Sequence, residues 1–145
     1  MNEAEIKELT GKVIGCAMKV HSALGSGFME SVYENALAHE LRKSGLKAEA
    51  QVAVKVLYDG VIVGDFIADL VLSDLIILEL KAVQSLSAVH EVQLVNYLNA
   101  TGKENGLLLN FGTRSLEFRH KYRRPKLTPP LTARSVSSAS GSSAA

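Results

Sequence analysis

The chain has 145 residues, of which 47% are hydrophobic, and its formal net charge at pH 7 is +1. This length allows one domain with a hydrophobic core, and this composition excludes a chain that is disordered throughout. A single cysteine, Cys16, excludes an internal disulfide framework and a cysteine-based zinc site, and no apolar run is long enough to cross a membrane. We therefore expect a protein of the reducing cytoplasm with no membrane partner, in which Cys16 is a small buried residue.

The charges are distributed unevenly along the chain. Residues 1–113 contain nine Lys or Arg and fourteen Asp or Glu, whereas residues 114–145 contain seven and one. A basic C-terminal stretch can contact phosphate backbones, but it can equally be a solvated tail. From the charges alone, the solvated tail is the favoured interpretation.

Two helices are expected at the start of the chain. Apolar side chains recur at helical spacing over residues 4–24 and again over residues 28–44. Glycines at both ends of the segment 25–27 break the pattern between them. Gly45 lies where a left-handed cap would end the second helix.

Three strands are expected next. Alternating apolar residues predict strands at 48–58 and 61–72, and the Asp-Gly pair at 59–60 predicts a hairpin turn between them. A second tight turn at 73–74 leads to a third strand at 75–83. That strand is apolar on both faces, so we expect it to be central in the sheet.

The last elements complete an α/β fold. Residues 85–100 have helical composition, with Ser85 or Ser87 as the N-cap. Residues 106–111 predict a strand parallel to the third one, because a helix separates the two, and residues 115–119 predict an outer strand. The expected order is α-α-β-β-β-α-β-β with a mixed sheet.

The composition also predicts where the domain ends. Residues 1–124 are expected to form a single domain. From residue 125 on, Pro, Ser, Thr, Ala and Gly dominate, and such a sequence cannot bury apolar surface. We therefore expect residues 125–145 to be a disordered tail.

Two charged residues interrupt the apolar third strand. Glu79 and Lys81 are two positions apart and so point to the same face of the sheet. The turn at 73–74 is about equally far from Asp69 and Glu79, so pairing across it places these two side by side. Two carboxylates at close range repel each other, a divalent cation relieves that repulsion, and oxygen ligands suit Mg²⁺ or Mn²⁺. The alternative is an ordinary ion pair of Glu79 with Lys81 on an exposed sheet face.

Further polar side chains share helix faces with one another. Glu30 lies in the first turn of the second helix, where it either serves a site or simply favours the positive helix end. In the third helix, the spacing of His90, Gln93 and Tyr97 puts them on one face. That face either lines a polar cleft beside the third strand or is solvated, and the sequence leaves both interpretations open.

Together these residues resemble the PD-(D/E)XK nuclease superfamily. Asp69 followed by Glu79-Leu80-Lys81 looks like its D…(D/E)-x-K signature, although Ala68 replaces the proline before the aspartate. Residues 27–33, GFMESVY, match the G-x-x-E-x-x-Y motif of the GxxExxY family. Residues 93–97 read Q-x-x-x-Y, as in RecB-type nuclease domains, and the similarity spans about residues 5–120.

The resemblance implies a restriction-endonuclease-like core of mixed sheet flanked by helices and Mg²⁺- or Mn²⁺-dependent hydrolysis of DNA. Asp69, Glu79 and the carbonyl of Leu80 would then hold the metal, with Glu30 completing the acidic cluster. Lys81 would orient or help deprotonate the attacking water and stabilise charge on the phosphate. The resemblance also implies that Gln93 and Tyr97 would position phosphate or water.

Three functions are compatible with the sequence. The favoured one is a metal-dependent nuclease acting on DNA, for which a homodimer would allow both strands of a duplex to be cut. The second is a non-catalytic module on the same fold that binds nucleic acid or a protein through the basic residues Arg119, Lys121, Arg123 and Arg124. The third is a structural or regulatory subunit, which would not require the acidic residues and the lysine.

Overall fold

The computed structural model describes residues 1–124, and their elements follow the predicted order. The helices are α1 (Glu3–Leu24), α2 (Glu30–Lys43) and α3 (Ala88–Thr101). The strands are β1 (Ala48–Tyr58), β2 (Val61–Leu72), β3 (Ile76–Lys81), β4 (Asn105–Asn110) and β5 (Glu117–Tyr122). The predicted tail, residues 125–145, lies outside the described residues. Within residues 1–124, no helix is long and apolar enough to span a membrane.

Local sequence signals explain where the helices begin and end. Asn2 caps α1 by accepting the backbone N–H of Glu5 at 2.8 Å, while the Glu5 side chain accepts the backbone N–H of Asn2. Of the two candidate caps for α3, Ser87 is the one used. Gly102 ends that helix with φ 76°, a left-handed conformation that glycine adopts without steric cost.

The five strands form one mixed sheet in the order β1-β2-β3-β4-β5. β3 pairs in parallel with β4, and every other neighbouring pair in the sheet is antiparallel. β3 is therefore the central strand, as predicted. The two predicted turns, 59–60 and 73–74, are both present and all four of their residues have positive φ.

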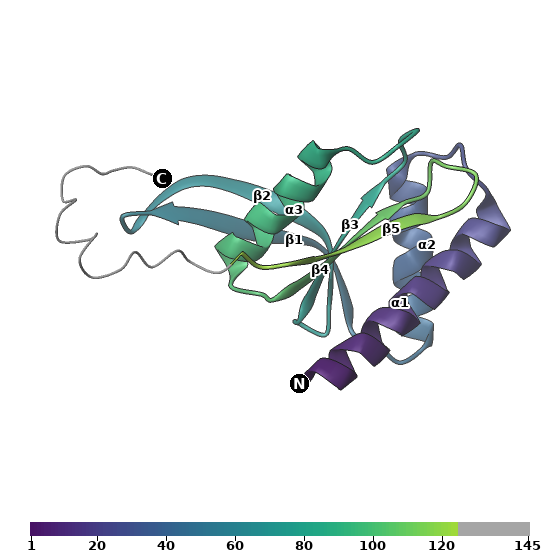
Figure 1. Ribbon diagram of the computed structural model, residues 1–145, viewed down its shortest axis with the longest axis horizontal. Coiled ribbons are helices and arrows are strands. Elements are labelled where there is room, and N and C mark those ends of the chain that lie inside the picture. Colours follow the sequence, from purple (N-terminus) through teal and green to yellow (C-terminus); the bar gives the residue numbers. More distant parts are fainter. Residues whose placement is uncertain (125–145) are drawn as a thin grey trace.

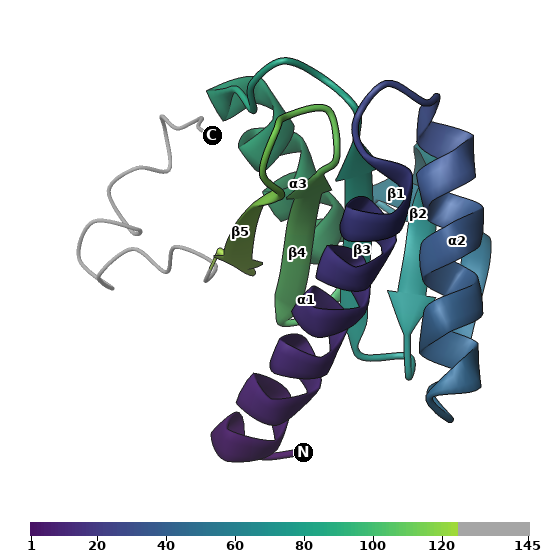
Figure 2. The same ribbon diagram turned by 90° about the vertical axis from the view of Figure 1, so that its right-hand side faces the viewer.

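Helices cover the two faces of the sheet unequally. α1 and α2 lie on one face and α3 on the other (Figures 1 and 2). The larger core cluster lies under α1 and α2, where the rings of Tyr33 and Phe111 stack 4.7 Å apart. A smaller cluster lies under α3 and includes Leu94 and Leu98. Cys16 is only partly buried, because it lies at the edge of α1 next to Ser44 rather than in the core.

Part-way along the β1–β2 hairpin, the side chains that pack in the core switch from one face of the sheet to the other. Ala48 and Leu70 pack in the cluster under α1 and α2, whereas Val54 and Ala68 pack in the cluster under α3. In a regular strand, residues separated by an even number would face the same side. The change occurs at Gln51, whose backbone is left-handed with φ 55°. Beyond this point the hairpin extends past the rest of the sheet (Figure 1).

Candidate active site

The candidate site lies where β2 and β3 stop pairing. The backbone ladder between these strands ends at Leu70 opposite Leu78. Beyond it, two carboxylates accept the backbone hydrogen bonds that a partner strand would otherwise accept. The N–H of Asp69 donates to Glu79 Oε2 at 3.0 Å, and the N–H of Leu80 donates to Asp69 Oδ2 at 2.8 Å. The structure therefore brings Asp69 and Glu79 together at the end of the strand ladder.

Glu79 is buried and Asp69 is partly buried. Glu79 is 7% exposed, and burial followed by the charge of Asp69 raises its pKa to about 8. Burial also raises the pKa of Asp69 to about 6, and the charges of Glu34 and Glu30 act in the same direction. The backbone hydrogen bonds and the charge of Lys81 oppose these shifts without cancelling them. Keeping both groups ionised near neutral pH thus requires additional positive charge at the site.

Lys81 ends β3 next to this pair and is partly exposed. Its charge lowers the pKa of Asp69 and of Glu79. Among residues 1–124, however, it takes part in no ion pair shorter than 4.0 Å. The alternative of an ordinary ion pair on an exposed sheet face therefore does not describe Glu79 and Lys81.

The acidic residues of α2 differ in their surroundings. Glu30 is exposed in the first turn, whereas Glu34, one turn later, is partly buried. Both Oε atoms of Glu34 accept hydrogen bonds from Gln51 Nε2, at 2.8 and 2.9 Å. Glu34 raises the pKa of both Asp69 and Glu79, whereas Glu30 raises that of Asp69. Glu34 was not among the predicted site residues, although its spacing of four from Glu30 places it on the same helix face.

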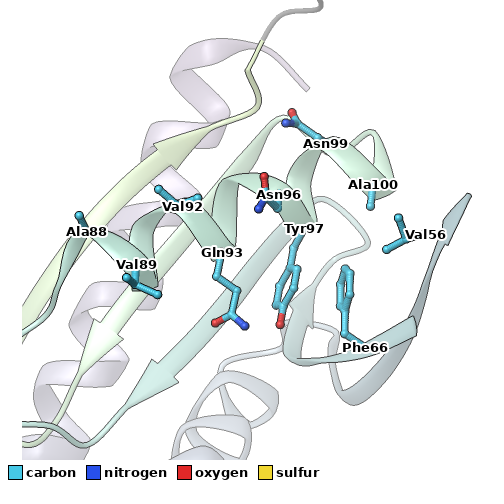
Figure 3. A pocket seen from close by; sticks show the side chains of 10 residues that line it. All are labelled: Val56, Phe66, Ala88, Val89, Val92, Gln93, Asn96, Tyr97, Asn99 and Ala100. Atoms are coloured by element: carbon cyan, nitrogen blue, oxygen red, sulfur yellow. The ribbon is translucent and has the colours of Figure 1, made fainter. Parts of the chain in front are cut away.

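Only two of the three polar residues predicted to share a face of α3 lie together. Gln93 and Tyr97 line a groove between α3 and the hairpin, where Tyr97 stacks on Phe66 (Figure 3). Burial, followed by the charges of Glu79 and Asp69, raises the pKa of Tyr97, so this side chain lies near the carboxylates. His90 instead caps the helix, because its Nδ1 accepts the N–H of Ser87 at 3.1 Å. Neither Gln51 nor Phe66 carried a signal that would have marked it in the sequence.

The basic residues of the C-terminal region are largely paired within the chain. Lys121 contacts Glu91 at 2.9 Å, and Arg119 approaches the same carboxylate at 4.0 Å. Arg123 contacts Glu104 at 2.6 Å. The backbone N–H of Arg124 donates to Asn99 at 3.1 Å. Three of the four predicted phosphate-binding side chains thus have an acidic partner on α3 or just after it.

The donor set fits a hard divalent cation. In the part of the chain that the structure describes, no group of three or more His, Cys, Asp or Glu side chains is placed to hold an ion. Asp69 and Glu79 therefore meet without Glu30 or another acidic side chain of the described residues placed as a third ligand. Mg²⁺ commonly binds through one or two carboxylates and keeps several waters, and an all-oxygen site suits it better than zinc.

The sequence and the fold are both similar to known proteins. The sequence profile described as the PD-(D/E)XK nuclease superfamily matches residues 7–124. A crystal structure of SSO0001 has a TM-score of 0.52 to this chain at 20% sequence identity, over 66% of this chain and 50% of SSO0001. This chain thus spans about half the length of SSO0001, and the likeness at this identity concerns the fold. No curated protein matches the sequence. The predicted restriction-endonuclease-like fold, a mixed sheet flanked by helices, is confirmed.

Proposed function

The chain belongs to the PD-(D/E)XK nuclease superfamily, and we propose that it is a nuclease that hydrolyses phosphodiester bonds of DNA with Mg²⁺ or Mn²⁺. The observation that carries this proposal is the pair of buried Glu79 and partly buried Asp69 at the end of the strand ladder, beside Lys81. Withdrawing two neighbouring carboxylates from water without an ion-paired cation is costly. The motif at residues 27–33 supports a place in the GxxExxY branch of the superfamily.

Each residue has a role that follows from its position. Asp69, Glu79 and the carbonyl of Leu80 would hold the cation, which would supply positive charge that lowers the pKa of water and neutralises the phosphate. Lys81 would orient a water molecule for attack on phosphorus, while the bond to the leaving oxygen breaks. Glu30 would add negative charge at the site from the first turn of α2. Gln93 and Tyr97 would position the phosphate from the groove side.

Binding to DNA without cleavage is the second candidate function. It would use Arg119, Lys121, Arg123 and Arg124 to contact phosphates. The ion pairs of the first three with Glu91 and Glu104 reduce the charge available for DNA and so favour the nuclease. We further propose that residues 1–124 fold as one domain, that the protein acts in the cytoplasm, and that it forms a homodimer.

The first test is calorimetric titration of Mn²⁺ into the wild type and into an Asp69→Asn/Glu79→Gln variant at neutral pH. We expect binding by the wild type and none by the variant. The same two proteins are then incubated with single-stranded and duplex DNA and Mg²⁺, and we expect the variant to lose at least about 10³-fold in rate. A folded wild type that neither binds Mn²⁺, with or without DNA, nor cleaves any of these substrates would refute the nuclease.

A further inference from the structure

A groove of about 820 Å³ is lined by Gln93 and Tyr97, two of the predicted site residues. α3 forms one wall and the β1–β2 hairpin forms the other (Figure 3). Its volume falls in the range of pockets that hold small organic ligands. The side chains that give the groove its character are Val56, Phe66, Val92, Gln93, Asn96 and Tyr97.

The chemistry of the lining selects a flat, uncharged ligand with polar edges. Among the described residues, no charged side chain lines the groove, so its interior offers no opposite charge to a phosphate and suits an uncharged group. Valine side chains and two aromatic rings supply apolar surface. Gln93, Asn96 and Asn99 supply amides, each of which both donates and accepts hydrogen bonds. A nucleobase has this combination of an apolar face and edges that donate and accept.

A stack of rings leads from the hairpin towards the active site. The rings of Phe66 and Tyr97 lie 3.6 Å apart and within 15° of parallel. Gln93 precedes Tyr97 by one helical turn, so the free side of the tyrosine ring turns towards the glutamine amide (Figure 3). Tyr97 also lies within the electrostatic reach of Asp69 and Glu79. A flat ring placed on Tyr97 would therefore extend the stack next to the carboxylates.

We propose that this groove binds an unpaired nucleobase of the strand that is cut, next to the phosphate at the active site. The proposal rests on the proposed nuclease function and gives it a substrate class. A base inside a duplex is stacked and paired, so entering the groove requires a base that is already free. The preferred substrate is then a single strand, or the single-stranded end or flap of a duplex, with its phosphate held outside the groove.

The test measures binding of labelled DNA to the full chain carrying Asp69→Asn/Glu79→Gln, in EDTA, so that neither cleavage nor a cation is needed. The probes are a short single strand, the same strand with one abasic position moved along it, and the blunt duplex. We expect the abasic position to weaken binding about tenfold at one place in the strand, because aromatic stacking of one base contributes that much. The blunt duplex is expected to bind more weakly than the single strand.

Matched variants separate the groove from the rest of the surface. Tyr97→Leu keeps an apolar side chain but removes the ring on which the base would stack, and it should abolish the difference between intact and abasic strands. Val92→Asp places a charge in the groove and should weaken single-strand binding about tenfold. Val63→Asp is the control, because Val63 is exposed to a similar degree, 58% against 50%, on the hairpin outside the groove. It should leave binding unchanged.

Several outcomes would overturn the proposal. Equal binding of intact and abasic strands at every position would do so, as would equal losses for Val92→Asp and Val63→Asp. A dimer of this chain that Tyr97→Leu dissociates, without any effect of the base, would assign the groove to a second copy instead. If binding depends on the base but the wild type never cleaves DNA, the nuclease proposal is refuted and the proposal that the groove binds a base stands. If the wild type cleaves DNA but binding does not depend on the base, only the proposal that the groove binds a base is refuted.

Discussion

The two faces of the sheet are built for different purposes. The face under α1 and α2 is closed by apolar side chains, and its largest members, including Tyr33 and Phe111, are fully buried. The face under α3 has a smaller apolar cluster, and next to it lie Asp69, Glu79 and the groove. Among the described helices, α3 alone covers that face (Figure 1). The comparison indicates that the first face supplies most of the stability and that the second can therefore hold costly charges.

The largest expected effect tests the closed face. Phe111→Ala removes a ring that is fully buried and stacked on Tyr33, so we expect the free energy of unfolding to fall by about 4 kcal/mol in urea titrations. The control is Phe118→Ala on β5, where the ring is 39% exposed, and it should cost about 1 kcal/mol or less. Similar losses at the two positions would contradict the assignment of stability to this face.

The second effect tests the costly charges. In the folded protein the pKa values of Asp69 and Glu79 are about 6 and about 8, against ordinary values of 3.8 and 4.5. Between these limits the folded state keeps protons that the unfolded state has lost, so stability without divalent ions must fall as the pH rises towards 8. We expect a loss of a few kcal/mol, because one pKa unit corresponds to about 1.4 kcal/mol and the two groups share the repulsion between their charges.

The measurement is urea unfolding between pH 4.5 and pH 8.5 in EDTA. Asp69→Asn/Glu79→Gln should flatten the pH dependence and stabilise the chain at pH 8, whereas Glu8→Gln, an exposed acid on α1, should change neither. Mn²⁺ should restore stability to the wild type at pH 8, because it binds only the ionised pair of the folded state. A wild type more stable at pH 8 than at pH 5 in EDTA would show that the pair is not destabilising.

The order of elements was predictable from the sequence because apolar periodicity and turn residues act locally. The ends of the strands were less predictable, because they depend on hydrogen bonds to side chains that are distant in the sequence. β3 was expected to reach Val83, but the N–H and the carbonyl of Val83 bond to the side chain of Asn110 at 3.0 Å and not to a strand. β5 was expected from residue 115, but it begins at Glu117, since Ser115 belongs to a turn in which its carbonyl accepts the hydroxyl of Thr113.

The candidate site likewise has one part that could be predicted from the sequence and one part that could not. The proximity of Asp69 to Glu79 was predictable, since a tight turn fixes the register of two consecutive strands. The contact of Phe66 with Tyr97 was not, because it depends on the change of facing at Gln51. A left-handed backbone at a residue other than glycine has no clear sequence signal. The groove could therefore not be predicted from the sequence, because it forms only when the hairpin folds. The carboxylate pair could be predicted, because its two residues lie on consecutive strands.

A third, smaller effect tests the packing of α3. Gly106 lies on β4 beneath Leu94, and a Cβ there would lie 2.9 Å from Leu94 Cδ1. Because the contact is with a flexible side chain, we expect Gly106→Ala to cost about 1 to 2 kcal/mol and Leu94→Val to recover part of it. Gly64→Ala is the control, since nothing lies within 4 Å of its Cβ position. Thermal unfolding measures all four chains, and no loss at Gly106 would show that α3 packs loosely.

The smallest expected effect compares an ion pair between β5 and α3 with an ion pair on the β1–β2 hairpin. Lys121 and Glu91 are paired at 2.9 Å, but both side chains remain about 30% exposed, so water screens their attraction. We expect a double-mutant cycle of Lys121→Gln and Glu91→Gln to give a coupling of about 0.5 kcal/mol that decreases with added salt. The same cycle for Lys55 and Asp65, a more exposed pair at 3.4 Å, should give less. A coupling above about 2 kcal/mol for Lys121 and Glu91 would mean that this pair fixes α3 against the sheet, and that the face carrying the site is also held by charge.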